Sequence, residues 1–384
     1  MRGIGNNVMS RPRTDTLIIG GGLHGLSAAL HLARAGLRVS VLEESWVGRH
    51  ASGASAAGVR TLNRHLAELP IALEALDMWH HIEAIVGDHC AFRPDGQINV
   101  AEFSHQVRVL EKRLAMTRAA GYEHVELIDR EELRRLVPAI SPHCVAALIA
   151  RRDGAADPHR TLRAFRRSAE AAGATIYERC GVTAIERVGS EWRVRAGRSD
   201  FTAPTIVNAA GAWAAKIAQM VGDDIPLGHK ASMMMVTERL APFLKPTVSA
   251  VGRTLSFKQT DRGTLVLGGG LQGRADVEAQ ASFVDFTELS KGARAAVDLF
   301  PSVDRVRVVR TWTGIEAKTD DLLPVIGPSP RADGVYYAFG FSGHGFELVP
   351  VVGAILADLI VRGSTERQIE AFSASRLINE RVAA

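Results

Sequence analysis

The clearest hydrophobic pattern of the chain lies near its start, where a short apolar run passes directly into a helical repeat. Residues 15–20 (DTLIIG) read as a buried parallel strand, because the apolar run is short and ends in glycines. Apolar residues then recur at helical spacing, at Leu23, Leu26 and Leu30. A second apolar run, residues 37–42, ends on an acid. The pattern therefore predicts a strand, a helix and a second parallel strand in succession.

Further segments with a strand or helix pattern follow along the chain. An amphipathic helix is predicted at residues 158–173, and another helix at residues 351–361, just after Pro350. Strands are predicted at five apolar or Val-, Thr- and Met-rich runs: residues 180–185, 229–237, 254–259 and 264–267, and the run that begins at residue 206. This mixture of strands and helices favours an α/β fold class.

Length, composition and charge narrow the class of protein. A chain of 384 residues exceeds one ordinary core, so we expect two domains. Hydrophobic residues make up 46% and charged residues 23%, which fits a soluble globular protein. The net charge of +4 comes from basic residues scattered over helical segments, so no nucleic-acid partner is expected. The first apolar run is too short for a signal sequence or a membrane span, which predicts a cytoplasmic protein without an integral membrane segment.

The three cysteines, Cys90, Cys144 and Cys180, share no close spacing. The sequence therefore suggests neither a metal site nor a disulfide framework, and a reducing compartment is the simplest interpretation. Three dispersed cysteines also cannot hold an iron–sulfur cluster.

The loop between the first strand and helix is a candidate nucleotide site. Gly20 permits a tight turn, Gly22 lets the backbone approach a pyrophosphate, and Gly25 lets the helix pack closely on the strand. The helix N-terminus carries a partial positive charge that attracts phosphate. Glu43 lies 18 residues after Gly25, where an acid can bind ribose hydroxyls, which argues against a 2'-phosphate. The alternative is a glycine-rich turn without a ligand, and the loop alone does not distinguish FAD from NAD.

Motifs spread along the rest of the chain carry a family resemblance. They are the small-residue segment 48–60 (GRHASGASAAGVR), then 206–213 (IVNAAGAW), 312–315 (WTGI), 321–327 (DLLPVIG) and 339–346 (FGFSGHGF). Together with the glycine loop they resemble the D-amino acid oxidase superfamily of FAD enzymes. Its members include glycine oxidase, sarcosine oxidases and the β subunits of opine and hydroxyproline dehydrogenases. Residues 60–70 look most like those β subunits.

The resemblance implies a discontinuous FAD-binding domain of the Rossmann type, formed by residues 12–84, 142–216 and 318–384. It implies an inserted α+β substrate domain, residues 85–141 and 217–317, built on a large mixed or antiparallel sheet. The segment 51–55 would run along the flavin, and the backbone of Val182 would touch adenine. The FAD should be non-covalent, because the family's C-terminal attachment cysteine is missing and the last cysteine is Cys180.

The expected cofactor-binding residues follow from the loop and the resemblance together. They are Gly20, Gly22, Leu23, His24, Gly25, Glu43, Glu44, His50, Ala51, Ser52, Ser55, Val182, Ala210, Gly211, Trp213, Gly314, Gly343, His344, Gly345 and Phe346.

Four residues are candidates for the chemistry. His344 lies in a turn that opens a helix, where backbone N–H groups can stabilise negative charge on a reduced flavin; the alternative is a loop histidine bound to backbone. Arg60 and Arg64 would share a face if their segment were helical and could clamp a substrate carboxylate, or they form a surface pair. Lys258 lies on a predicted strand, and its side chain points to the opposite face from those of Phe257 and Gln259. It is a candidate oxygen-activating cation.

Two acids depart from the family pattern. Glu316 stands where glycine and D-amino acid oxidases carry an arginine, and Glu347 where monomeric sarcosine oxidases carry a lysine. A carboxylate bound at either place would meet like charge. We therefore expect Glu316 or Glu347 to face a cationic part of the substrate.

The function implied by the resemblance is oxidation of a C–N bond in a secondary amine or imino acid, of the opine, hydroxyproline or sarcosine type, by hydride transfer to flavin N5. One alternative is oxidation of a 2-hydroxy acid, for which His344 or His50 would have to serve as the base. Another is a FAD-bearing electron-relay subunit. Relatives of the β-subunit type work with a larger chain and a small iron–sulfur chain, so companion subunits or another electron acceptor are expected beside the amine substrate.

Overall fold

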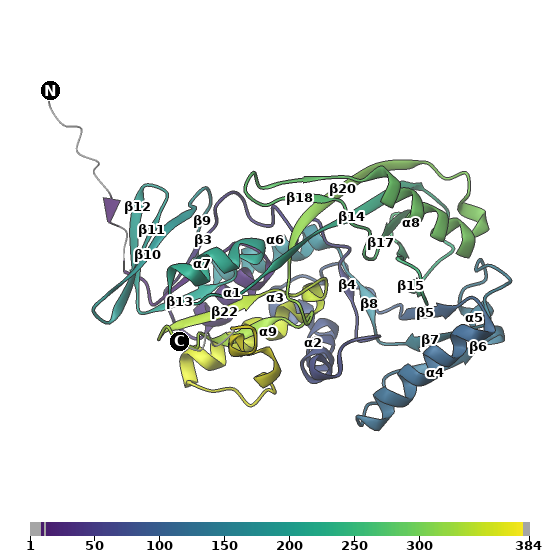
Figure 1. Ribbon diagram of the computed structural model, residues 1–384, viewed down its shortest axis with the longest axis horizontal. Coiled ribbons are helices and arrows are strands. Elements are labelled where there is room, and N and C mark those ends of the chain that lie inside the picture. The colour runs from purple at the N-terminus through teal and green to yellow at the C-terminus, as the bar shows by residue number, and fades with distance from the viewer. Residues whose placement is uncertain (1–8, 11–12, 379–384) are drawn as a thin grey trace, which may run out of the picture. The chain divides into compact units, whose positions relative to one another are not determined.

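The computed structural model describes residues 9–10 and 13–378 and divides into two compact units (Figure 1). The first unit contains the described residues of Met1–Gly53, Leu162–Gly228 and Ala317–Ala384. The second unit contains Ala54–Thr161 and His229–Glu316. This division differs from the expected domain limits at residues 54–84 and 142–161, which cluster with the second unit, and at residues 217–228 and 317, which cluster with the first. The reason for the first difference is local pairing, because β4 (Gly58–Val59) is antiparallel to β8 (Gly154–Ala155).

The first unit is built on a six-stranded sheet with the order β21-β22-β13-β2-β3-β9. β2 pairs in parallel with both β3 and β13, and only β21 runs antiparallel to its neighbour. The strands are β2 (Thr16–Ile19), β3 (Val39–Leu42), β9 (Thr175–Tyr177), β13 (Thr205–Asn208), β21 (Val325–Pro328) and β22 (Val335–Phe339). The predicted strand–helix–strand unit is therefore confirmed, with every residue of β2 and β3 buried.

Helices α1 (Leu23–Arg34) and α9 (Gly345–Arg362) pack side by side in the first unit (Figure 1). Their approach is close, since a Cβ on Gly353 would lie 2.2 Å from Ser27 Oγ. The helix predicted at residues 351–361 begins six residues earlier than expected. Pro350 lies inside it rather than before it, at the cost of one helical hydrogen bond.

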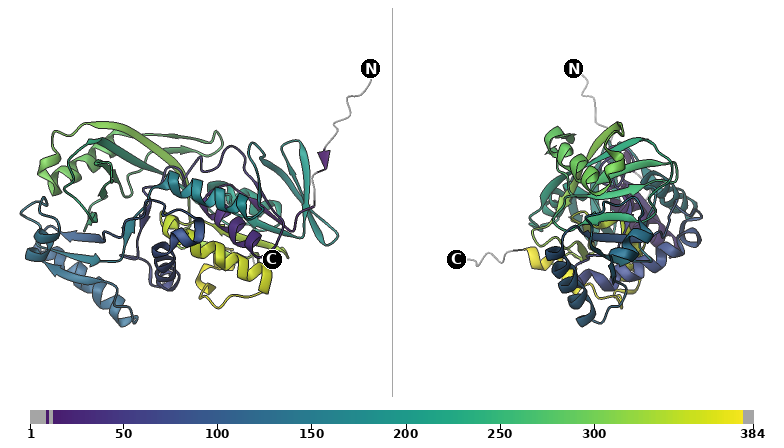
Figure 2. Two further views of the ribbon diagram at one scale, coloured as in Figure 1. Left: turned by 180° about the vertical axis from the view of Figure 1, so that it is seen from behind. Right: turned by 90° about the vertical axis from the view of Figure 1, so that its right-hand side faces the viewer.

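Other elements of the first unit complete its architecture. A small sheet of β10 (Val182–Val188), β11 (Glu191–Ala196) and β12 (Ser199–Ala203) is joined by β1 (Met9–Ser10), the purple strand of Figure 2. The remaining helices are α6 (Pro158–Ala171), which begins in the second unit, α7 (Ala214–Met220) and the 3-10 turns Gly211–Trp213, Glu370–Phe372 and Ala374–Leu377.

The second unit is built on an eight-stranded sheet with the order β20-β14-β17-β16-β15-β5-β7-β6. The sheet is mixed, as expected, because β15 is parallel to β5 whereas β16 is antiparallel to both β15 and β17. The strands are β5 (Gln97–Ala101), β6 (Glu126–Asp129), β7 (Ala146–Ala150), β14 (Gly228–Arg239), β15 (Thr247–Ala250), β16 (Ser256–Gln259), β17 (Thr264–Gly268) and β20 (Val308–Lys318). β14 begins at Gly228 of the first unit, and β20 ends at Lys318, also in the first unit.

Helices cover this sheet and close its apolar core. Leu289 and Leu299 of α8 are buried in one cluster with Met233, Phe257 and Leu267 of the strands. The helices are α2 (Leu69–His80), α3 (Ile82–Val86), α4 (Ser104–Ala119), α5 (Arg130–Leu136), α8 (Phe286–Leu299) and the 3-10 turns Leu66–Glu68 and Pro301–Val303. A hairpin of β18 (Arg274–Asp276) and β19 (Ala281–Phe283) completes the unit. Among the described helices of the whole chain, none is both long and apolar enough to cross a membrane.

Candidate active site

The glycine loop of the first unit has no room for side chains. Gly20 has a φ of +110°, and a Cβ there would lie 2.4 Å from the Ala209 carbonyl oxygen. A Cβ on Gly25 would lie 2.0 Å from the carbonyl oxygen of Gly20, so helix α1 can start this close to β2 only with glycine. At Gly22 the nearest atom is Ser52 Oγ, which accepts a hydrogen bond from the Leu23 N–H at 3.0 Å. The loop therefore presents bare backbone at the N-terminus of α1.

Two acids follow β3 beside this loop. Glu43 Oε2 accepts the N–H of Gly21 at 2.7 Å, and Oε1 accepts the N–H of Ser45 at 2.9 Å. Burial raises the pKa of Glu43, and these hydrogen bonds oppose the rise. The Glu44 side chain lies against Gly181, next to Val182 at the start of β10. The acid predicted at the end of the second strand is therefore fixed beside the loop.

His24 joins the glycine loop to the start of α9. Its ring stacks on Phe341, with centroids 3.7 Å apart and planes 4° from parallel. A Cβ on Gly345 would lie 2.9 Å from His24 Nε2. Burial lowers the pKa of His24 to about 3, so the ring is neutral at physiological pH. A neutral ring suits this position, because the N-terminal ends of α1 and α9 both disfavour a cation.

The turn before α9 has a specialised backbone. Gly340, Ser342 and Gly343 all have positive φ, at 73°, 53° and 95°. The His344 N–H donates to the Phe341 carbonyl oxygen at 2.8 Å, and α9 begins at the next residue. The turn therefore opens a helix, as predicted. Glu347, in the first turn of α9, is fully buried within the first unit.

A second pair of predicted residues meets in the first unit. The rings of His50 and Trp213 lie 4.5 Å apart with an interplanar angle of 50°. Trp213 ends the 3-10 turn after β13, in which Gly211 has a φ of +54° and the Ala210 N–H is bound by Asn208. Burial lowers the pKa of His50 to about 4, so this ring is also neutral near pH 7.

Arg60 and Arg64 follow β4 in the second unit, and their segment is not helical. Asn63 has a φ of +62°, and the Arg64 Nε donates to the Arg60 carbonyl oxygen at 2.8 Å. The shared helical face considered for the two arginines is therefore wrong. The segment is instead held as a turn by Asp153, which sequence reasoning missed. Arg64 is only 1% exposed, whereas Arg60 is half-buried.

Lys258 lies on β16 and is 8% exposed. Its Nζ donates to the Ala156 carbonyl oxygen at 3.3 Å. Burial lowers the pKa of Lys258 to about 8, and the charge of Arg93 lowers it further while Asp157 opposes. Phe257 and Gln259 on the opposite side of the strand are also buried, so both faces of β16 are covered.

Three residues of the predicted motifs occupy every second position of β20. Trp312, Gly314 and Glu316 are two residues apart and so point to one face of the strand. The Trp312 Nε1 donates to the Ala54 carbonyl oxygen at 3.1 Å, next to Ser55. Glu316 Oε2 accepts a hydrogen bond from Ser232 Oγ of β14 at 3.2 Å.

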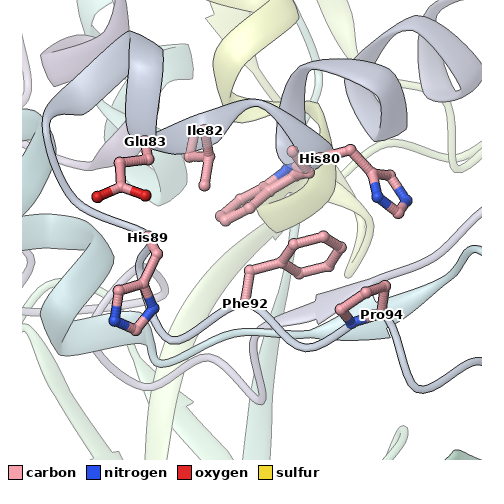
Figure 3. A pocket seen from close by; sticks show the side chains of 7 residues that line it. His80, Ile82, Glu83, His89, Phe92 and Pro94 are labelled. Carbon is pink, nitrogen blue, oxygen red and sulfur yellow. The ribbon is translucent and has the colours of Figure 1, made fainter.

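A cavity of about 210 Å³ in the second unit is lined by a different set of residues (Figure 3). Its lining includes Trp79, His80 and Phe92 but none of the predicted site residues. The His80 Nε2 is bonded to the Arg152 carbonyl oxygen at 3.1 Å. The cavity thus contains none of the groups considered for the chemistry.

A parallel sheet with a bare glycine loop, a helix N-terminus and an acid at the end of the second strand defines a dinucleotide-binding α/β protein. Residues 15–359 match the family model DAO, FAD dependent oxidoreductase, and the chain belongs to this family. It is therefore an enzyme that uses FAD. The residues present fit this cofactor, because Gly20 and Gly25 admit no side chain and leave bare backbone at the N-terminus of α1, where a pyrophosphate can lie.

Relatives match almost the full length of the chain. The sarcosine oxidase subunit beta of Rhizobium meliloti (strain 1021) is 26% identical over 95% of this chain and 89% of its own length. The glycine oxidase of Bacillus licheniformis is 27% identical over 95% of this chain and 98% of its own. The crystal structure of L-proline dehydrogenase from P. horikoshii superposes with a TM-score of 0.88 at 25% identity, covering 96% and 98% of the two chains.

Proposed function

We propose that this enzyme oxidises the C–N bond of a secondary amine or imino acid, such as an opine, a hydroxyproline or a sarcosine-like N-alkyl amino acid. The observation that supports the proposal is the set of names carried by the relatives that match almost the full length of this chain. They are named for sarcosine, glycine and L-proline, three small amino acids. Secondary amines include two of these three.

When bound, FAD supplies the acceptor for the hydride that leaves the carbon bearing nitrogen. The chain's own groups bind and orient the substrate and stabilise the negative charge that develops. The backbone N–H groups at the start of α9 can stabilise negative charge, because the helix N-terminus is positive there. Gly343, His344, Gly345 and Phe346 form this end of α9. No side-chain base is required for an amine that is deprotonated when it binds.

Arg60 is the residue we propose for the substrate carboxylate. Both arginines of its segment donate to backbone carbonyls, but Arg64 is buried whereas Arg60 is half-buried. A guanidinium can bind a carboxylate through two parallel hydrogen bonds. Glu316 or Glu347 would then face a cationic part of the substrate, and Lys258 would supply a positive charge in the electron-accepting step.

We also propose that the chain works with companion subunits. The Rhizobium meliloti relative is named as a subunit, which supports this proposal. The sequence has three cysteines that share no close spacing, too few for an iron–sulfur cluster, so we propose that any such cluster in the electron path belongs to another chain.

The test is the visible spectrum of the purified protein, followed anaerobically during addition of candidate substrates. The panel contains sarcosine, D- and L-proline, hydroxyproline isomers, opines and 2-hydroxy acids. We expect one class of secondary amine to bleach the flavin bands. Bleaching by 2-hydroxy acids alone would contradict the proposal and support alcohol oxidation. Flavin that nothing in the panel bleaches would support the electron-relay alternative.

A further inference from the structure

Asp153 is a buried carboxylate directly before β8, and its side chain is 0% exposed. It accepts three hydrogen bonds. The N–H groups of Thr61 and Leu62 donate to Oδ2, each at 2.9 Å, and the Thr61 hydroxyl donates to Oδ1 at 2.6 Å. These three donors all belong to the two residues that follow Arg60. A buried carboxylate is thus used to fix one short stretch of backbone.

The same stretch of backbone orients the Arg60 side chain. The Arg60 Nη1 donates to the Leu62 carbonyl oxygen at 3.0 Å, on the residue whose N–H is bound by Asp153. Because peptide units are planar, holding the N–H groups of Thr61 and Leu62 fixes two successive units, and the carbonyl that receives Arg60 follows directly. The positive φ of Asn63 adds a turn that needs such support.

Asp153 and Arg60 flank the short strand pair of β4 and β8. In the antiparallel pair of β4 and β8, Gly58 is opposite Ala155 and Val59 is opposite Gly154. Arg60 directly follows β4 and Asp153 directly precedes β8, so each lies one residue beyond the last pair. The start of β8 is held by Arg93, whose N–H donates to the Ala155 carbonyl oxygen at 2.9 Å and whose carbonyl oxygen accepts the Ala155 N–H at 3.1 Å.

We infer that Asp153 is a positioning residue that presents the Arg60 guanidinium to the carboxylate of the substrate. The inference rests on the proposed function, in which Arg60 binds that carboxylate. An arginine side chain has several rotatable bonds, and ordering it before the ligand arrives lowers the cost of binding. Asp153 supplies this order through the Thr61 and Leu62 backbone, without touching the substrate.

The test uses the FAD-loaded enzyme and a carboxylate that cannot be oxidised, pyrrole-2-carboxylate, with pyrrole as the analogue that lacks the carboxylate. Binding is measured from the change in the flavin absorption spectrum. We expect Asp153→Ala to weaken pyrrole-2-carboxylate about tenfold, because misplacement of a binding group by about 1 Å has effects of this order or larger. The affinity for pyrrole should not change. With the true substrate, KM should rise while kcat stays within about twofold.

Asp153→Asn separates hydrogen bonding from charge. The amide oxygen of asparagine can accept both backbone N–H groups, and its NH2 group can donate to the Thr61 hydroxyl oxygen. We therefore expect Asp153→Asn to bind pyrrole-2-carboxylate with the wild-type affinity to within about threefold. A loss as large as that of Asp153→Ala would overturn positioning by hydrogen bonds.

A matched control removes a half-buried helix cap elsewhere in the same unit. Asp285 Oδ1 accepts the Glu288 N–H at 3.0 Å at the start of α8. Asp285→Ala should lower Tm and leave the affinity for pyrrole-2-carboxylate unchanged. If Asp153→Ala weakens pyrrole as much as pyrrole-2-carboxylate, its role is only structural and the inference is wrong.

Arg60→Leu distinguishes failure of the inference from failure of the proposed function. If Arg60→Leu loses carboxylate binding and Asp153→Ala does not, the positioning role is wrong and the proposed carboxylate site stands. If Arg60→Leu keeps carboxylate binding, the proposed site is wrong and the inference falls with it. Should Asp153→Ala fail to fold, Thr61→Val decides. It removes one of the three bonds, and unchanged affinity for pyrrole-2-carboxylate would overturn the inference.

Discussion

At the scale of single residues, burial decides which ionisable groups of the candidate site carry charge. The pKa values of His24 and His50 fall to about 3 and about 4, so both rings are neutral at physiological pH. Lys258 is buried too, but its pKa falls only to about 8, which leaves it largely protonated at pH 7. Lys258 of the second unit therefore carries a positive charge near pH 7, whereas His24 and His50 of the first unit do not.

Lys258 gives a prediction for stability against pH. Burial lowers its pKa from 10.5 to about 8 in the folded chain, so between these pH values the unfolded chain binds more protons. The contribution of Lys258 to the free energy of unfolding therefore rises with pH across that window, by about 3 kcal/mol in total. Below pH 8 the burial penalty is fully present.

The measurement is urea unfolding of the wild type and Lys258→Met at pH 7 and pH 10. We expect Lys258→Met to gain stability relative to wild type at pH 7 and to lose most of that gain at pH 10. Lys216→Met, at an exposed position of α7, is the control and should show no such pH dependence. An equal difference between Lys258→Met and wild type at both pH values would contradict the prediction.

The two acids that depart from the family pattern give a second prediction at this scale. If Glu316 or Glu347 faces a cationic part of the substrate, replacing it with glutamine removes an attractive charge. We expect kcat/KM on the true substrate to fall about tenfold or more in Glu316→Gln or Glu347→Gln, since charged hydrogen bonds contribute about 1.5–3 kcal/mol. Glu366→Gln, at an exposed position, is the control. Unchanged kcat/KM in both site variants would reject the idea.

At the scale of elements, the contact of α1 with α9 is set by glycine. In an open helix, Gly353→Ala would stabilise by about 1 kcal/mol through helix propensity. Here the new Cβ would lie 2.2 Å from Ser27 Oγ and 2.6 Å from the Ser27 carbonyl carbon, so a backbone and not only a side chain must move. Overpacking costs about 1–3 kcal/mol, and backbone contact places this site at the upper end.

We therefore expect Gly353→Ala to lower the free energy of unfolding by about 1–2 kcal/mol, after its propensity gain is subtracted. The shift of α9 should also lower FAD content, because Gly345 at its start packs on His24 of α1. Thermal unfolding and the flavin-to-protein absorbance ratio measure both effects. Ser364→Ala, exposed just after α9, should change neither. A Gly353→Ala variant more stable than wild type would show that the helices separate at little cost.

At the scale of the whole molecule, two units each have an apolar core of their own. The glycine loop belongs to the first unit, so FAD should stabilise that unit most directly. A ligand that binds only the folded state adds about 2.7 kcal/mol at a free concentration of 100 times its Kd. We expect Tm to rise with added FAD in protein from which the flavin has been removed.

We also expect the whole protein to hold FAD without a covalent bond. All three cysteines are buried, and none lies in the C-terminal third of the chain. After precipitation with acid, we expect the flavin colour in the supernatant and a colourless pellet. Flavin that stays with the pellet would show a covalent bond to another side chain.

The sequence alone determined the features that depend on neighbours along the chain. The strand–loop–helix–strand unit at residues 15–42 was predictable because apolar spacing and glycine positions are local constraints on the backbone. The placement of Glu43 beside the loop followed, because the carboxyl ends of parallel strands lie at one edge of the sheet. The mixed sheet of the second unit was anticipated from the family resemblance. Contacts of Val182, Ala51 and Ser55 with the cofactor stay predictions.

Only the tertiary structure decided the features that join distant segments. The turn at Arg60 and Arg64 is held by hydrogen bonds to Asp153, 92 residues from Thr61 in sequence, and no local pattern encodes such a partner. The stacking of His24 on Phe341 likewise joins the two ends of the chain. Helix α9 runs through Pro350, since packing against α1 outweighs one lost hydrogen bond. Local periodicity fixes elements, whereas burial and long-range hydrogen bonds fix the site.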